Sequence, residues 1–195
     1  MAAALDDPGS PDLTDHLRPI AGLGRGISAF IVGYVVVTGL WFIDGAVGGT
    51  FTGFNGLVFG GIDRLLASHF GAADALVTDG ATAAVPVAAY AMVPVLLLGY
   101  NGWGIANRYG AQTGQAAAVA GASTAVGYAV AVVGSIAALT LLVELILAAF
   151  GVQVVTGGIV YISSPRVLLV AGLIYPTVFG GLGGYVGYRW RTRLA

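Results

Sequence analysis

Residues 116–150 read AAAVAGASTAVGYAVAVVGSIAALTLLVELILAAF, an apolar run that contains one ionisable side chain, Glu144. A run of about 18 or more apolar residues predicts a membrane-spanning helix, because a helix satisfies its own backbone hydrogen bonds in lipid. As one helix this run would be about 52 Å long, well beyond a hydrocarbon core of about 30 Å. The helix must therefore tilt, break near one of its glycines, or project from the membrane.

The rest of the chain also has the composition of a membrane protein. Of its 195 residues, 57% are hydrophobic and 9% are charged, and the mean hydropathy is +0.90. An average soluble domain is about 25% charged, so this set of residues cannot cover a water-facing surface. The 32 glycines are far above the average share of about 7%, and small residues let membrane helices approach closely. We expect a glycine-rich protein with tight helix packing.

Three further apolar runs, residues 27–47, 81–99 and 167–188, are each long enough to cross a bilayer once. We predict an all-α, polytopic membrane protein with four transmembrane helices in a single domain, residues 23–195. Residues 1–22 are acidic and contain three prolines, so we expect a polar N-terminal tail. A signal peptide is not expected there, because it would need a positive region directly before its apolar core.

The segments between the spans carry weaker patterns. Within residues 48–80, apolar side chains recur at roughly helical spacing beside Asp63 and Arg64. This amphipathic pattern favours a helix in the membrane interface, with a re-entrant segment as the alternative. Residues 100–115 are polar and aromatic, which predicts a loop. In residues 151–165 the β-branched residues around Gly157 and Gly158 resemble a short β-hairpin.

The arginines predict how the chain is threaded. Arg18 and Arg25 precede the first span, Arg108 lies between the second and third, and three arginines follow the fourth. The two remaining loops hold only Arg64 and Arg166. Because positive charge marks the cytoplasmic side, we expect a multi-pass protein of the cell membrane with both termini in the cytoplasm.

Glu144 is the sharpest candidate for a functional residue. A carboxylate near the centre of a membrane costs about 2.5 kcal/mol or more, and such groups usually face inward and find a partner. Counted along the helices from their outer ends, Glu144 lies about 9 Å and Tyr175 about 12 Å deep in the membrane. Asp44 and Tyr90 lie near the same level. One hypothesis is a cluster that binds an ion or relays a proton. The alternative is that Glu144 bonds to a tyrosine or an arginine and locks helices together.

Several glycines have the spacing of helix-packing positions. Gly180, Gly184 and Gly187 fall at i, i+4 and i+7 on one face of the fourth span, and Gly127 and Gly134 lie on the third. GxxxG spacing lets two helix backbones approach closely. It is no nucleotide fingerprint here, because no strand precedes it. The partner of these faces is either another helix of the chain or another subunit.

The composition excludes several classes of site. No cysteine is present, so disulfides and thiolate metal sites are absent, and two histidines are too few for a His-rich metal site. A net charge of −1 gives no basis for a nucleic-acid partner. No Ser/His/Asp arrangement, phosphate-binding loop or HExxH motif occurs. We expect no cofactor, no metal and no enzymatic activity.

All eight basic residues are arginine and none is lysine, while aspartates crowd the N-terminus. In this feature, and in the segment YPTVFGGLGG at residues 175–184, the chain resembles the uncharacterised small multi-pass membrane proteins of halophilic archaea. The resemblance is loose over the whole chain and transfers no functional residue.

Two functions agree with these patterns. The first is a structural or assembly subunit of a membrane complex, or a homo-oligomer, with the lipid bilayer and other membrane subunits or itself as partners. The abundant packing glycine and the single deeply placed charge favour it. The alternative is a small ion or proton-coupled transporter or channel that uses Glu144, together with Asp44 and Tyr175.

Overall fold

The computed structural model describes residues 13–48, 53–69, 85–150, 165 and 168–194, and none of these forms a β-strand. The elements are, in chain order, η1 (Leu13–His16), α1 (Pro19–Gly48), α2 (Gly53–Ser68), α4 (Val87–Arg108), α5 (Gly114–Ala122), α6 (Thr124–Phe150), η2 (Leu168–Ile174) and α9 (Tyr175–Leu194). Four helices are long and apolar enough to cross a membrane: Pro19–Val47, Val87–Arg108, Gly114–Leu142 and Leu168–Leu194. The predicted all-α fold with four spans is confirmed.

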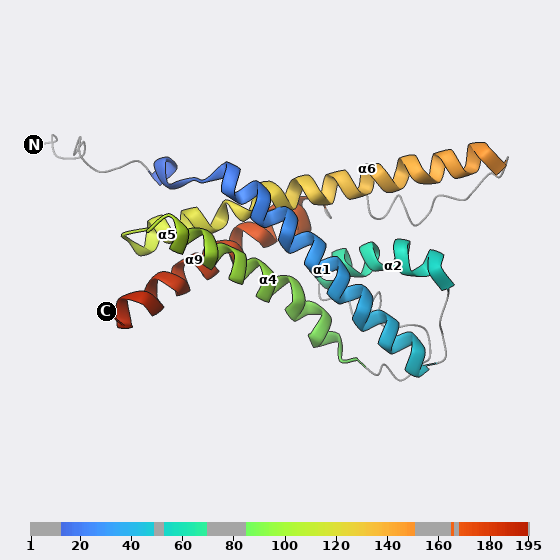
Figure 1. Cartoon of the computed structure of the whole chain (residues 1–195), viewed down its shortest axis with the longest axis horizontal. Coiled ribbons are helices and arrows are strands. Elements are labelled where there is room, and N and C mark those ends of the chain that lie inside the picture. The colour runs from blue at the N-terminus through green and yellow to red at the C-terminus, as the bar shows by residue number, and fades with distance from the viewer. Residues whose placement is uncertain (1–12, 49–52, 70–84, 151–164, 166–167, 195) are drawn as a thin grey trace, which may run out of the picture.

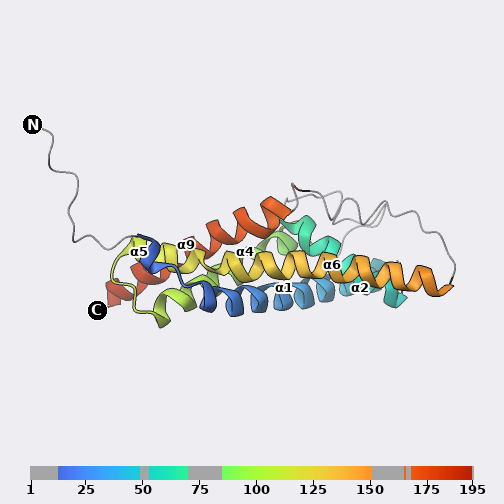
Figure 2. The same ribbon diagram turned by 90° about the horizontal axis from the view of Figure 1, so that it is seen from above.

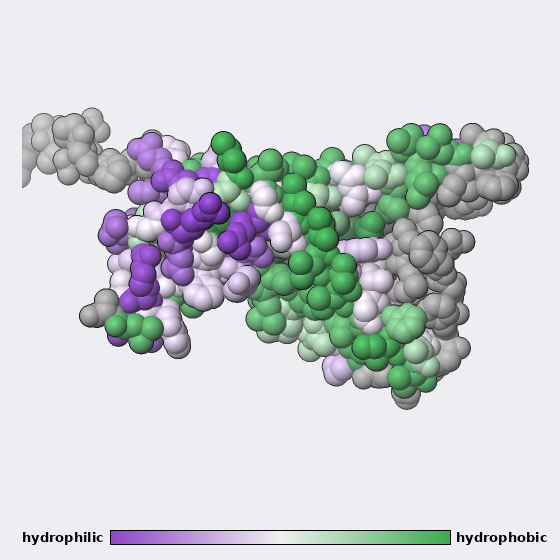
Figure 3. Space-filling model, in the orientation of Figure 1, coloured by the Kyte–Doolittle hydropathy of each residue, from purple (hydrophilic) through white to green (hydrophobic). Residues whose placement is uncertain are grey.

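The four spans alternate in direction, so α1 begins and α9 ends at the same end of the bundle (Figures 1 and 2). We call this the terminal end, and the opposite end the distal end. Hydrophilic residues gather at the terminal end, and hydrophobic residues cover much of the remaining described surface in this view (Figure 3). Such a surface suits a protein embedded in a membrane.

The second span lies further along the chain than the sequence pattern indicated. It covers Val87–Arg108 instead of residues 81–99, so the predicted loop begins only after Arg108. The polar residue Asn101 does not end the helix, because it is buried and its amide donates to the Leu97 carbonyl oxygen at 2.8 Å. The turn comes at Gly110, where φ is +60°, a conformation that glycine adopts readily.

The third span breaks and also projects. The break lies between α5, which ends at Ala122, and α6, which begins at Thr124. Breaking and projecting are two of the three solutions expected for a run that is too long to cross the membrane once. At the break the Thr124 hydroxyl lies 2.9 Å from the Gly121 carbonyl oxygen and 3.3 Å from that of Pro176 on α9. At its distal end α6 extends past the other helices (Figures 1 and 2).

The fourth span begins as a π-helix, η2, and continues as α9. The change of helix type coincides with Pro176, which has no backbone N–H to donate to the preceding turn. Directly after Pro176, the Thr177 hydroxyl donates to the Leu173 carbonyl oxygen, one turn earlier, at 2.7 Å. This side chain supplies a hydrogen bond where the helix changes.

Glycine brings the spans together at backbone distance. A Cβ added to Gly183 on α9 would lie 2.6 Å from the Cα of Gly99 on α4, and one added to Gly26 on α1 would lie 2.7 Å from the carbonyl carbon of Gly127 on α6. Real Cβ atoms essentially never come this close to other atoms. Both interfaces therefore depend on the absence of a side chain at these positions.

The predicted interfacial helix is not confirmed. α2 packs against α1 and α4, and the residues of its last turn, together with His69 directly after it, are buried in the bundle. The described apolar residues Ile62, Leu65 and Leu66 of this pattern are buried against other helices. A sequence pattern alone does not distinguish such a helix from an interfacial one. The predicted hairpin at residues 151–165 lies outside the described residues, apart from Pro165.

Candidate functional site

Two groups of polar side chains lie in the interior of the bundle, one with a residue of α2 and one with His69, which directly follows α2. The first is at the distal end of α1, where Asp44 is 5% exposed and its Oδ1 accepts the backbone N–H of Val85 at 3.2 Å. Nearby, the Arg64 guanidinium of α2 stacks over the ring of Trp41 at 4.1 Å. Stacking on an aromatic face suits a guanidinium in a partly buried position.

Tyr90 of α4 completes this group, which we call the Asp44 cluster: Asp44, Arg64 and Tyr90. Tyr90 is 1% exposed, and both the Asp44 carboxylate and the Arg64 guanidinium act electrostatically on its phenol. Its hydroxyl makes no hydrogen bond within the described part of the chain. Because an unsatisfied buried hydroxyl costs about 1 to 3 kcal/mol, this position suits a water molecule or another small polar species.

The second group is centred on His69 and consists of His69, Tyr128 on α6 and Tyr175 on α9; we call it the His69 cluster. The His69 Nδ1 lies 2.7 Å from the Leu65 carbonyl oxygen, and its Nε2 lies 2.9 Å from the Tyr128 hydroxyl. The Tyr175 ring packs edge-on against the imidazole at 4.8 Å. Since a carbonyl oxygen only accepts, Nδ1 carries the proton, and the Tyr128 hydroxyl donates to Nε2.

His69 is held neutral in this position. Burial lowers its pKa to about 4, and the hydrogen bonds to the backbone of Leu65 and Leu66 only partly oppose this effect. With both ring nitrogens bonded, the neutral imidazole fastens the end of α2 to α6. The arrangement is that of a structural anchor, because it presents no free nitrogen for a metal or a substrate.

No family model, curated protein or solved structure matches this chain. Among the residues that the structure describes, no three His, Asp or Glu side chains gather in a group that would hold a metal ion.

The three residues that the sequence grouped into one ion or proton site lie in different surroundings. Glu144 is exposed on α6, Asp44 belongs to the Asp44 cluster, and Tyr175 packs against His69. Counting residues from the helix ends assumed that α6 stops level with its neighbours. Because the distal end of α6 projects past the other helices, that assumption does not hold.

The glycines singled out in the sequence also fall into two kinds. An added Cβ would overlap the α5 backbone at Gly180 and Gly184, a tryptophan ring of α4 at Gly187, and the α1 backbone at Gly127. At Gly134 an added Cβ would meet nothing within 4 Å. Gly134 lies on an exposed face of α6, so no close contact within the described chain requires a glycine there.

Sequence reasoning missed the functional interest of His69 and Arg64. His69 was considered only as one of two histidines, although it directly follows four apolar or small residues, Leu65, Leu66, Ala67 and Ser68. Four such positions in sequence leave no polar face at the end of the helix. That local loss of amphipathicity is the one signal that indicated burial.

Proposed function

We propose that this protein is a non-enzymatic membrane subunit that assembles laterally, either with other chains of a membrane complex or with its own copies. The distal end of α6 would be its contact surface. One observation carries the proposal: Glu144 is exposed on this apolar helix end, and none of the described side chains forms an ion pair or hydrogen bond with it.

The exposed distal end of α6 is unfavourable in lipid and in water alike. Beside Glu144, Leu141 and Leu145 are 58% and 59% exposed. In lipid, the carboxylate would cost about 2.5 kcal/mol or more. In water, the leucines would forgo much of the roughly 1.5 to 3 kcal/mol that burial of such a side chain provides. A second helix that covers the leucines and offers a donor to Glu144 removes both costs.

The test is purification of the full-length protein from its native membrane in mild detergent, followed by mass measurement of the intact complex. We expect a fixed ratio with another chain or a small homo-oligomer, and Glu144→Gln and Leu145→Ala should each weaken it. Val133→Ala is the matched control, because Val133 is 54% exposed on the same helix nearer the bundle centre. A monomer in native membrane extracts, or equal effects of all three variants, would refute the proposal.

The orientation of the bundle is part of the same proposal. The arginines support a cytoplasmic terminal end, which holds the start of α1, the α4–α5 turn and the end of α9. Since the chain has no cysteine, single cysteines at Ser10 and Thr113 should react with a membrane-impermeant reagent only from the cytoplasmic side. Cysteines at Ala73 and Ser164 should react only from outside. The opposite pattern would reverse the orientation.

A second candidate function is conduction of protons or small cations. The Tyr90 hydroxyl beside Asp44 favours it, because none of the described residues forms a hydrogen bond with this hydroxyl. A buried carboxylate next to an unsatisfied hydroxyl provides an acceptor and a donor for a transferred proton. If this function holds, Asp44→Asn and Tyr90→Phe should lower proton or Na⁺ flux into liposomes, whereas Glu144→Gln should not. Flux equal to that of protein-free liposomes would remove this candidate.

A further inference from the structure

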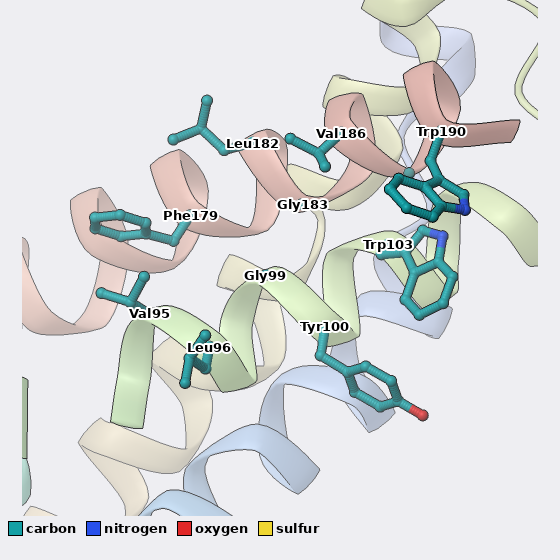
Figure 4. A pocket seen from close by; sticks show the side chains of 11 residues that line it. Val95, Leu96, Gly99, Tyr100, Trp103, Phe179, Leu182, Gly183, Val186 and Trp190 are labelled. Atoms are coloured by element: carbon teal, nitrogen blue, oxygen red, sulfur yellow. The ribbon is translucent and has the colours of Figure 1, made fainter. Parts of the chain in front are cut away.

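An apolar groove of about 700 Å³ runs between α4 and α9 on the outside of the bundle (Figure 4). Gly99 and Gly183, where the two backbones approach closely, lie along it. Leu96, Phe179, Leu182 and other apolar side chains form its walls. The groove exists because the helices meet through glycine and carry larger side chains on either side of that contact.

The groove does not stop at its apolar part. A second cavity, of about 500 Å³, shares Trp103, Gly187 and Trp190 with the first and is also lined by Asn107 and Arg191. One continuous depression therefore changes from apolar to polar and cationic along its length. The two tryptophans lie where the lining changes from apolar to polar, and Figure 4 shows them at one end of the apolar part. Tryptophan is enriched at the level of lipid headgroups.

The polar part of the groove is equipped for an anion. Arg191 donates one Nη2–H to the Ala111 carbonyl oxygen, and a guanidinium has five N–H donors in all. Arg189 and Arg193 are exposed on the same helix, and Arg108 is exposed at the end of α4. Neither α4 nor α9 contains an aspartate or glutamate, so these cationic charges meet no acidic side chain on the two helices that form the groove.

We propose that this groove binds one anionic phospholipid. One of its acyl chains lies along Gly99 and Gly183, and its phosphate accepts hydrogen bonds from Arg191 and Asn107. An occupant must be apolar over most of its length and anionic at one end, which is the chemistry of such a lipid. Arginine also suits a phosphate because its planar group bonds two oxygens at once. The site is separate from the distal end of α6, so it does not depend on the proposed assembly surface.

The experiment uses the full-length protein in vesicles of phosphatidylcholine that contain a minor fraction of a lipid with brominated acyl chains. Bromine quenches tryptophan at short range, and Trp41→Phe leaves only Trp103 and Trp190, both in the groove. We expect brominated phosphatidylglycerol to quench more strongly than brominated phosphatidylcholine, with a preference of roughly fivefold per arginine engaged. Arg191→Gln should reduce this preference.

A matched pair of variants tests the apolar part. A Cβ at Gly99 would meet only the Phe179 carbonyl oxygen, at 3.9 Å, and one at Gly39 on α1 would meet nothing within 4 Å. Gly99→Leu should therefore fill the groove and abolish selective quenching, while Gly39→Leu should leave it unchanged. Equal quenching by the two lipids, or equal losses in both variants, would overturn the proposal. So would a dimer that Gly99→Leu dissociates without changing lipid preference, because the occupant would then be a second copy.

Discussion

Replacing Gly180 by alanine should destabilise the bundle far more than the same replacement at Gly134. A Cβ at Gly180 would overlap the Thr124 hydroxyl and lie 2.6 Å from the Gly121 carbonyl oxygen, where ordinary contact begins at 3.4 Å. α9 would have to move about 0.8 Å away from α5, the difference between these two distances. Gly184 lies on the same face one turn later, so the displacement would loosen its contact too.

These distances determine the expected loss of folding stability. Overpacking of a well-packed core costs about 1 to 3 kcal/mol, and a rigid backbone oxygen as the obstacle places Gly180→Ala near the upper value. For a chain of this size each kcal/mol shifts Tm by roughly 2 to 4 °C, so a fall of roughly 6 to 12 °C is expected. Gly134→Ala meets no atom and gains helix propensity, up to about 1 kcal/mol.

The assay is thermal unfolding of each purified variant in the same detergent, followed by circular dichroism. Gly39→Ala on α1 serves as a second control, because a Cβ there also meets nothing within 4 Å. If Gly134→Ala lowered Tm as much as Gly180→Ala, close contact between the described helices would not be what makes glycine necessary. The assignment of Gly180 to a tight interface would then be wrong.

Three further variants test the interior. Tyr128→Phe leaves the His69 Nε2 without its donor and should cost about 1 to 3 kcal/mol of unfolding free energy in chemical denaturation, whereas Tyr185→Phe, at an exposed position, should cost nothing. Thr124→Val removes the hydroxyl bonded at the α5–α6 break and should cost about 1 kcal/mol, which Thr124→Ser should restore; equal stability of the two variants would contradict this role. Because burial lowers the pKa of His69 from 6.5 to about 4, the unfolded chain binds more protons between these values, so stability should fall by about 3 kcal/mol as pH drops through this range. His69→Gln should flatten that part of the pH profile, and an unchanged profile would show that His69 does not titrate there.

The four spans could be predicted from sequence because each depends on a local property. An apolar run must form a helix in lipid whatever its neighbours are. Their ends were predicted less well, since they depend on single contacts. Asn101 looked like a loop residue, but its bond to Leu97 keeps it inside α4. Polar character alone does not show whether such a bond forms.

The candidate site could not be predicted because it depends on contacts between distant parts of the chain. His69 is defined by Tyr128 and Tyr175, which come from two other helices. The same difficulty separates Gly180 from Gly134: both have small neighbours at helical spacing, but only Gly180 faces another helix. Spacing identifies a face that can pack, and the arrangement of the helices decides whether it does.

The position of His69 also sets the order in which the protein can be built. Its hydrogen-bond partner Tyr128 is 59 residues further along the chain. At a synthesis rate of about 5 to 20 residues per second, roughly 3 to 12 s pass before the ribosome has made that tyrosine, and Tyr175 follows later still. α2 can pack against α1 once both have been made, but His69 completes its contacts only after Tyr128 and Tyr175 have followed. The C-terminal end of α2 is therefore made early and completes its native contacts late.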